Sequence, residues 1–182
     1  MQIHLLAIIN PLFLRMEGQR QIIGRFDRID LPDFGAMNIG AKIDTGAYSS
    51  AIHCSKIKLY KKKGKRYISF HILDSHIPVI EHRRFITSRF RKKKVRSSSG
   101  HVEKRYFIET YIILFGEKLL VEFSLSDREN MRFPVLLGRK MLKNRFLVDV
   151  ALIDVSYHRK IAQTGPQRDN IDFVEWDMDA EE

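Results

Sequence analysis

The sequence predicts an all-β fold. Short apolar or alternating runs, rich in Ile, Val, Leu, Phe and Tyr, recur between turn signals from about residue 21 to 155. Helical periodicity is confined to one short segment, and the pattern lacks the regular alternation of strands and helices that a doubly wound domain needs. With 182 residues, 44% of them hydrophobic and 30% charged, the chain fits one globular domain with its own core.

The expected strands follow one another between turn signals. Examples are residues 21–29, 36–43, 67–73, 105–114, 118–125 and 132–137. We expect one short helix at residues 139–144, where Met141 and Leu142 lie on one side among basic residues. Two basic stretches, 56–66 and 89–96, interrupt the pattern, and the second holds six positive charges in eight residues. Runs of this kind are typical of solvated loops or hairpin tips.

Charge divides the chain unevenly. Thirty-two Lys and Arg against 22 Asp and Glu give a net charge of +10, so the surface should attract an acidic peptide or nucleic acid. Residues 163–182 carry seven acidic side chains and one Arg, a net −6 that leaves +16 for the first 162 residues. We expect an N-terminal extension at residues 1–20. Two interpretations of it stay open: it does not belong to the native protein, or it is disordered. A β-domain at 21–160 and an acidic tail at 161–182 follow it.

We expect a cytoplasmic protein that does not cross a membrane. The longest apolar run, residues 3–14, is shorter than the roughly 20 residues of a spanning helix and is interrupted by Asn10 and Pro11. The one cysteine, Cys54, cannot form an intrachain disulfide, so the disulfide framework of a small secreted domain is not indicated.

The most informative motif is Asp44-Thr45-Gly46, which follows an apolar strand and precedes the small residue Ala47. Alone, such a tripeptide is a common turn, because Asp accepts hydrogen bonds from the next amides and Gly tolerates a positive φ. A second element about ninety residues later adds weight to it. The run 133–139 combines a buried-looking strand with Gly138 and Arg139 and leads into the expected helix.

Together these elements resemble retropepsin-like aspartic proteases. The runs 44–53, 99–105, 108–110, 125–131, 133–139 and 146–149 are similar to a bacterial and archaeal family labelled ATP-dependent zinc protease or RimB-like retropepsin. The resemblance covers about residues 22–155. It implies a closed barrel of six or more strands with one short helix, an aspartic peptidase activity and an association with ATP-grasp glutamate ligases.

The chemistry of such a peptidase requires two carboxylates about 3 Å apart that share one proton, one acting as base and the other as acid. One Asp-Thr-Gly motif supplies only one carboxylate, so we expect a homodimer that brings Asp44 of each subunit to the two-fold axis. Thr45 would form hydrogen bonds across the axis, Gly46 would permit close backbone approach, and Ala47 would leave room for substrate beside the carboxylate.

The same resemblance places a covering hairpin, or flap, within residues 83–110. It suggests substrate-binding roles for Ser99, Gly100, His101 and Arg105. A solvated charged hairpin is an equally good interpretation of the lysine run 92–94. Arg128 is the last candidate for substrate binding, with a structural turn pair between Asp127 and Arg128 as the alternative.

Charge and family association both favour an acidic peptide, or a glutamate-rich tail, as the substrate. The alternative is a non-catalytic module of the same fold that binds RNA or an acidic protein. In that case the basic runs, with Phe85, Phe90 and Tyr106 nearby, would supply a surface for stacking and phosphate binding.

We expect neither a metal nor a cofactor. His53 with Cys54, or the group Asp74, His76, Glu81 and His82, could be drawn as ligands, but no pair has a convincing zinc spacing. A buried structural role is the more usual one for an isolated cysteine in a β-rich run, so Cys54 is not expected to be a nucleophile. The sequence also has no Gly-rich phosphate loop, so ATP binding by this chain is not indicated.

Overall fold

The computed structural model describes residues 20–73, 84–96 and 102–165, and β-strands dominate these parts of the chain. The strands are β1 (Gln21–Ile23), β2 (Phe26–Leu31), β3 (Ala36–Asp44), β4 (Ser50–Lys62), β5 (Lys65–Ile72), β6 (Arg84–Thr87), β7 (Phe90–Arg96), β8 (Val102–Leu114), β9 (Glu117–Ser126), β10 (Val135–Gly138) and β11 (Phe146–Val148). The helical segments are η1 (Pro32–Phe34, a 3-10 turn), α1 (Arg139–Leu142) and α2 (Val155–Thr164). The mainly β class is therefore confirmed.

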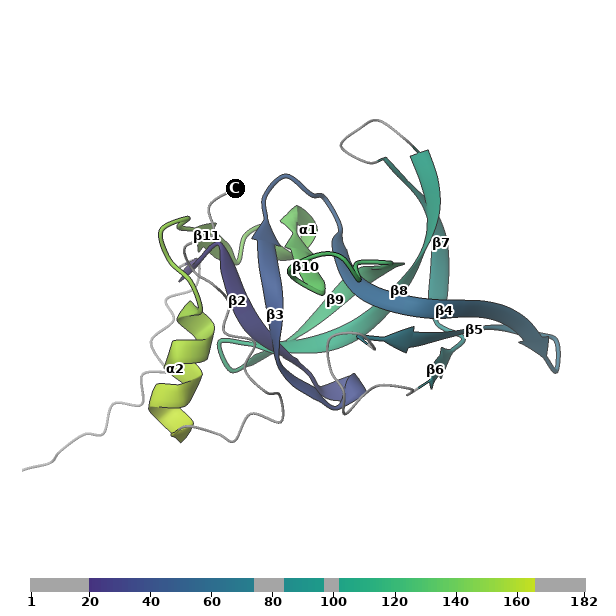
Figure 1. Cartoon of the computed structure of the whole chain (residues 1–182), viewed down its shortest axis with the longest axis horizontal. Coiled ribbons are helices and arrows are strands. Elements are labelled where there is room, and N and C mark those ends of the chain that lie inside the picture. Colours follow the sequence, from purple (N-terminus) through teal and green to yellow (C-terminus); the bar gives the residue numbers. More distant parts are fainter. Residues whose placement is uncertain (1–19, 74–83, 97–101, 166–182) are drawn as a thin grey trace, which may run out of the picture.

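Six of the described strands pair in a ring (Figure 1). β3 lies between β2 and β10, β10 also pairs with β4, and β4 continues through β9 and β8 to β2. One register pair, Asp30 with Ile113, joins β2 to β8. The pairing order agrees with the expected architecture, while full closure into a barrel stays a prediction.

Two long strands extend beyond this ring. The first residues of β4 are buried in the ring, whereas its outer half is exposed and pairs with β5. Lys63 and Gly64 connect β4 to β5 with positive φ angles of 48° and 76°, as a tight two-residue hairpin turn requires. β8 likewise pairs with β9 along most of its length and with β7 toward its start. Figure 1 shows β4–β5 and β7–β8 as two arms on one side of the molecule.

The two basic stretches therefore lie in these arms. The run 56–66 forms the outer part of the β4–β5 hairpin, and 89–96 lies mostly in β7. Their charge predicted solvated loops or hairpin tips, whereas the structure shows that most of both runs forms β-strand. Alternating exposure and backbone pairing allow strands to carry many cations as long as the side chains reach water.

The core is formed by strands of the ring together with β1 and β5. Its largest fully buried side chains include Ile29, Ile52, Phe70, Ile112 and Phe123. These are apolar positions of the expected strands or of β4 beside them. Their burial supplies the main driving force that holds the ring together.

The expectation of a single short helix was wrong. α1 occupies the predicted position, but a second helix, α2, packs on β2 and extends the ordered fold to Thr164, inside the segment expected to be acidic tail. The buried Asp27 carboxylate accepts hydrogen bonds from the N–H groups of Ser156 (2.8 Å) and Tyr157 (3.2 Å) in the first turn. Lys160 bonds both carboxylate oxygens of Asp30 at 2.9 Å. These groups of β2 fix a helix that the sequence pattern did not reveal.

The first expected strand is interrupted at Gly24. A Cβ at this position would collide with the carbonyl oxygen of Leu152, so the close approach of the 149–153 segment requires glycine between β1 and β2. β6 and β11 are further short strands, in addition to the runs named from the sequence. Over the described residues, no helix has the length and apolar character needed to span a bilayer.

Candidate active site

Asp44 is the last residue of β3, and the chain returns through residues 45–49 to β4. Its Oδ1 atom accepts hydrogen bonds from the N–H groups of Gly46 (2.8 Å) and Ala47 (3.0 Å). A Cβ at Gly46 would lie 3.1 Å from the same oxygen, a tight contact that favours glycine there. The loop therefore orients the carboxylate through one oxygen, and Oδ2 takes no part in these two bonds.

The second motif supports this loop directly. β10 pairs in parallel with β3, with Gly138 in register with Asp44. The Gly138 N–H donates to the buried Ser50 hydroxyl oxygen at 3.1 Å, and the Arg139 N–H donates to the carbonyl of Ala47 at 2.9 Å. Backbone groups at the end of β10 and the start of α1 therefore hold both ends of the Asp44 loop.

The Arg139 side chain adds a third attachment. Its Nη1 atom donates to the carbonyl oxygens of Thr45 (2.9 Å) and Gly46 (2.7 Å). These carbonyls follow Asp44 directly, so the guanidinium fixes the part of the loop that determines the direction of the carboxylate. These hydrogen bonds explain why an Asp-Thr-Gly loop and a later Gly-Arg pair occur together in the sequence.

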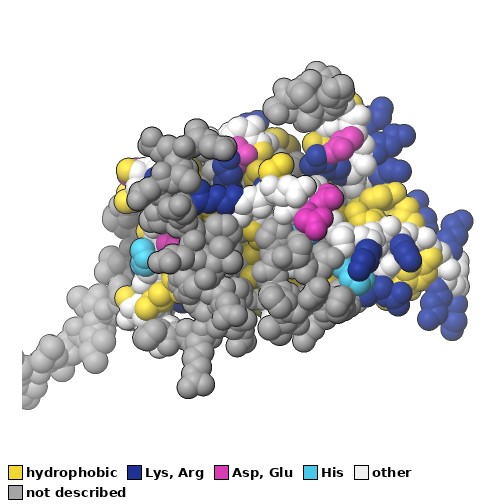
Figure 2. Space-filling view, viewed as in Figure 1, with side chains coloured by type: hydrophobic (Ala, Val, Ile, Leu, Met, Phe, Trp, Pro, Cys, Tyr) yellow, Lys and Arg dark blue, Asp and Glu magenta, His cyan; other side chains and the backbone are white. Residues whose placement is uncertain are grey.

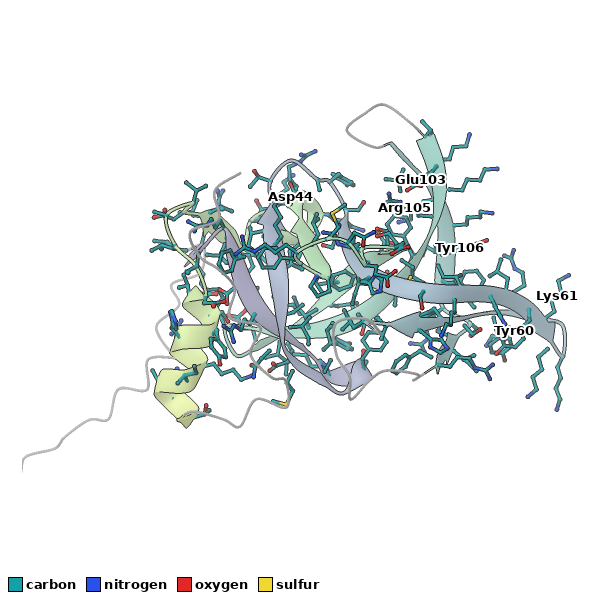
Figure 3. The ribbon with its side chains drawn as sticks, viewed as in Figure 1. Asp44, Tyr60, Lys61, Glu103, Arg105 and Tyr106 are labelled. Atoms are coloured by element: carbon teal, nitrogen blue, oxygen red, sulfur yellow. The ribbon has the colours of Figure 1, made fainter. Side chains whose placement is uncertain are left out.

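The loop borders a cavity of about 850 Å³. Asp44 lies at one side of it, and residues of β7, β8 and β9 lie at the other; Figure 3 labels Asp44 and Arg105 among these residues. Among its described lining residues, six carry positive charge: Lys93, Lys94, Arg105, Arg128, Arg139 and Lys140. Asp44 and Glu122 are the acidic side chains of the same lining. The cavity is therefore predominantly cationic around one candidate catalytic carboxylate.

Arg105 and Arg128 are two neighbouring cations in the lining of this cavity. Burial lowers the pKa of Arg105, and its guanidinium also forms an ion pair with Glu103 on the same strand (Figure 3). Burial first, and then the charge of Arg105, lowers the pKa of Arg128, while the charge of Asp44 opposes this effect. The charges of both Arg105 and Asp44 therefore act on the Arg128 guanidinium.

The backbone around Arg128 is held by polar contacts. Its N–H donates to Nδ1 of the buried His53 at 2.9 Å, and its Nε donates to the carbonyl of Phe133 at 3.2 Å. Asp127 accepts the N–H of Glu129 at 3.0 Å, which forms a local turn. Asp127 therefore stabilises a local turn, while Arg128 lines the cavity and is anchored to a backbone carbonyl. A binding role and a turn role for Arg128 both stay predictions.

Glu122 connects two further cations of the cavity. Its carboxylate accepts Lys93 Nζ at 2.5 Å and Lys140 Nζ at 2.8 Å, which ties β7 to α1 through β9. Burial opposes ionisation of Glu122, but the hydrogen bonds and charges of Lys140 and Lys93 outweigh it and hold its pKa below the ordinary value. This carboxylate neutralises part of the positive lining and positions both lysines.

The predicted site residues are distributed as follows. Asp44, Gly46, Ala47, Arg105 and Arg128 all line the cavity, and Thr45 is exposed beside them with its carbonyl bonded to Arg139. Ser99, Gly100 and His101 lie outside the described residues. The roles assigned to all of these residues stay predictions.

Of the residues considered as metal ligands or as a cysteine nucleophile, those that the structure describes are not among the residues that line the cavity. Cys54 is buried in the core, and His53 bonds the backbone of Arg128. Asp74, His76, Glu81 and His82 lie outside the described residues. Within the part of the chain that the structure describes, no group of three or more His, Cys, Asp or Glu side chains is arranged to hold a metal ion.

Sequence reasoning missed Glu122, Lys93 and Lys140 as parts of one ionic cluster. Their spacing, 29 and 18 residues, carries no local motif. The signal that exists is alternation along β9, where Glu122 breaks a run of apolar residues next to the buried Val121 and Phe123. A charge within such a run indicates either a pairing partner or a functional cavity.

The Asp-Thr-Gly loop is thus held by Gly138 at the end of the parallel strand β10 and by Arg139 at the start of α1, within an all-β ring. The family model described as retropepsin-like aspartic endopeptidase RimB matches residues 22–158, and the chain belongs to this RimB-like family.

Curated relatives include a protein of Shewanella halifaxensis, 34% identical over 138 residues, and one of Desulfotalea psychrophila, 32% identical over 136 residues. Both are named probable alpha-L-glutamate ligase. The matches cover 74% and 73% of this chain and 29% of each relative, so the chain spans less than a third of their length.

A crystal structure of a protein of unknown function from Legionella pneumophila is similar in fold. The TM-score is 0.56 and the identity 24%, over 76% of this chain and 99% of that chain. This likeness concerns the fold alone.

Proposed function

We propose that the protein is an aspartic peptidase that works as a homodimer through paired Asp44 carboxylates. One observation carries this proposal: the Asp44 carboxylate is oriented by two loop amides beside an 850 Å³ cavity. Membership of a family described as aspartic endopeptidases supports it. The closed barrel and the cytoplasmic location belong to the same proposal.

In the proposed dimer, one Asp44 is ionised and its symmetry mate is protonated, because two like charges this close cannot both persist. The ionised carboxylate takes a proton from a water molecule, whose oxygen attacks the peptide carbonyl carbon. The protonated carboxyl donates its proton to the carbonyl oxygen. Collapse of the tetrahedral intermediate breaks the C–N bond, and the amine leaves with a proton from the dyad. Arg139 acts as a positioning residue, since it contacts the loop carbonyls and not the carboxylate.

The cationic lining supports an acidic peptide as the substrate class. Lys93 and Lys140 are paired with Glu122, and Arg105 is paired with Glu103. We assign Arg128 the role of binding a substrate carboxylate. Its guanidinium donates to the carbonyl of Phe133, and the charge of Asp44 affects its pKa. The relatives named probable glutamate ligases are consistent with glutamate-rich peptides as that substrate.

Replacement of the carboxylate tests the reaction. Asp44→Asn keeps the shape of the side chain and removes the group that must exchange protons, so hydrolysis of a glutamate-rich peptide should be lost while the circular dichroism spectrum stays unchanged. Parental turnover by the purified variant would contradict an aspartic mechanism. Activity that disappears with a chelator and returns only with zinc would favour a metallopeptidase instead.

Dilution tests the assembly. With one carboxylate per chain, activity per subunit should fall once the concentration drops below the dimer dissociation constant. Sedimentation and turnover measured over the same concentrations should change together. Full activity from a demonstrated monomer would contradict the paired dyad.

A further inference from the structure

A second groove lies on the opposite face of the β7–β8 arm from the Asp44 cavity. Successive side chains of a strand point to opposite faces. Arg105 and Phe107 line the Asp44 cavity, whereas Tyr106 between them lines the second groove. The groove has a volume of about 530 Å³ and is bounded on its other side by the β4–β5 hairpin. We call it the tyrosine groove and define it by Tyr60, Tyr67, Phe90 and Tyr106.

Aromatic rings line this groove from both arms. Tyr60 and Tyr67, paired across β4 and β5, are stacked with ring centroids 5.6 Å apart and an interplanar angle of 17°. Phe90 and Tyr106, from β7 and β8, meet edge to face at 6.0 Å. Tyr60 is 38% exposed and the adjacent Leu59 is 51% exposed, so this part of the hairpin presents large apolar groups to solvent. Figure 3 shows Tyr60 and Lys61 on the hairpin and Tyr106 on β8.

Cations accompany the rings. Lys92 Nζ lies 5.2 Å from the centre of the Tyr106 ring, and Lys61 and Arg66 are exposed on the hairpin and also line the groove. Residues 55–72 contain seven Lys and Arg and no Asp or Glu. Figure 2 shows the resulting cluster of basic side chains over the β4–β5 hairpin. The charge on this arm is therefore not neutralised by acidic residues of the same hairpin.

We propose that the tyrosine groove binds single-stranded nucleic acid. The exposed Tyr60 ring and the half-buried rings beside it provide faces on which unpaired bases stack, and the surrounding cations attract the phosphates. An acidic peptide would use the cations but has no planar groups that require four aromatic rings. The groove faces away from the Asp44 cavity, so this binding is independent of the proposed peptidase reaction.

The rings are tested with the full chain and a fluorescent oligouridylate of about 12 nucleotides. Tyr60→Ala should weaken binding at least about fivefold, because stacking on one aromatic side chain typically contributes that much or more. Tyr60→Leu keeps an apolar side chain but lacks a planar face, so it should weaken binding similarly. The matched control is Tyr111→Ala, since Tyr111 is 39% exposed but lies outside the groove.

The cations are tested by salt dependence. Replacing Lys61 and Lys92 together by Ser should weaken binding and reduce the slope of log affinity against log salt by about 1 to 2. Lys118→Ser is the control, because Lys118 lies over Tyr111 in a comparable cation–ring pair, 4.3 Å from the ring centre, outside the groove. This control should leave both affinity and slope close to those of the parent.

Two polyanions without bases complete the test. Inorganic polyphosphate should bind more weakly than the oligouridylate at equal salt. Tyr60→Leu should change neither the binding of polyphosphate nor that of a polyglutamate peptide, for which the Asp44 cavity is the proposed site. Equal binding of polyphosphate and oligouridylate, or oligouridylate binding that is unchanged by both Tyr60 variants, would overturn the proposal. Stronger binding of polyglutamate that depends on Tyr60 would identify a peptide groove instead. Asp44→Asn should not change oligouridylate binding, so failure here is distinguishable from failure of the peptidase proposal.

Discussion

Gly138 lies in register with Asp44 in the parallel pairing of β10 with β3, and a Cβ at Gly138 would approach the carbonyl oxygen of Ser49 to 2.6 Å. The backbone of the Asp44 loop therefore packs directly against Gly138, where there is no room for a side chain. The position of the candidate carboxylate depends on this close approach, because the N–H groups of residues 138–140 bond the loop and the start of β4.

Gly138→Ala should therefore reduce activity strongly. The added methyl group must displace backbone atoms of the loop, a change that typically costs about 1–3 kcal/mol in a packed region. Urea unfolding and turnover of a glutamate-rich peptide measure the two effects. Gly64→Ala at the hairpin tip is the control: its Cβ would meet no neighbour, and its positive φ of 76° should cost about 1–2 kcal/mol without loss of turnover. Equal turnover of both variants would contradict the role of Gly138.

Arg139→Ala should lower the turnover number more than it changes the Michaelis constant. The variant loses the two hydrogen bonds to the carbonyls of Thr45 and Gly46, so Asp44 is held less well for the transition state. We expect a loss of roughly tenfold or more, with stability reduced by about 1 kcal/mol. Arg159→Ala on the exposed face of α2 is the control. An effect on the Michaelis constant alone would show that Arg139 binds substrate instead.

Arg128→Ala should raise the Michaelis constant for a glutamate-rich peptide. The guanidinium is the cation that we assign to a substrate carboxylate, and a charge-assisted hydrogen bond of this kind is worth about 1.5–3 kcal/mol. A peptide in which Gln replaces Glu serves as the matched substrate control, and the variant should hydrolyse it about as well as the parent does. Equal losses on both peptides would assign Arg128 to the structure of its turn, through the Phe133 carbonyl, and not to substrate charge.

Glu122→Gln should destabilise the protein only where the carboxylate is ionised. The pKa of Glu122 is lower in the folded chain than in the unfolded one, so its contribution is present above the unfolded pKa and is lost as the pH falls through the folded pKa. The difference in unfolding free energy between parent and variant, about 1 kcal/mol at neutral pH, should therefore vanish in acid. A difference that is independent of pH would show that packing, and not the ion pairs with Lys93 and Lys140, is responsible.

The Asp-Thr-Gly and Gly-Arg motifs could be recognised in the sequence because each consists of residues that are adjacent in the chain. Asp44, Thr45 and Gly46 form one turn, and Gly138 with Arg139 follows a recognisably apolar strand. By contrast, α2 presents few apolar residues of its own. Its first turn is fixed by Asp27, 129 residues earlier in the chain, and such a contact leaves no periodic signal.

The arms were obscured for a related reason. The outer half of β4 is exposed, so it lacks the apolar alternation by which half-buried strands are recognised. Backbone pairing with β5 and the turn at Lys63 and Gly64 maintain it instead. The opposite orientations of Arg105 and Tyr106, and thus the separation of two surfaces, follow only once the pairing of β7 with β8 is known.

Asp27 makes the free energy of unfolding depend on pH in the opposite direction to Glu122. Burial raises the pKa of Asp27 to about 6 from an ordinary value of 3.8, although N–H groups of Ser156, Arg28 and Tyr157 oppose this shift. Stability from this group is therefore complete below the unfolded pKa and is lost as the pH rises through the folded value. The loss amounts to about 3 kcal/mol at neutral pH.

Asp27→Asn should abolish this dependence. Relative to the parent, the variant should gain stability as the pH rises from about 4 to 7, measured by urea unfolding at each pH. Asp33→Asn is a control, since its carboxylate is exposed and bonds Thr110 and the N–H of Tyr111. A relative loss of stability over the same interval would contradict the raised pKa of Asp27.

The paired Asp44 dyad is tested most directly by mixing. Parent and Asp44→Asn chains are combined at constant total concentration, above the dimer dissociation constant, and allowed to exchange subunits before turnover of a glutamate-rich peptide is measured. If each active site needs one carboxylate from each subunit, mixed dimers are inactive, and activity should follow the square of the parent fraction, about one quarter at equal amounts. Activity that follows the parent fraction linearly, about one half at equal amounts, would show that each chain works alone and would contradict the paired dyad.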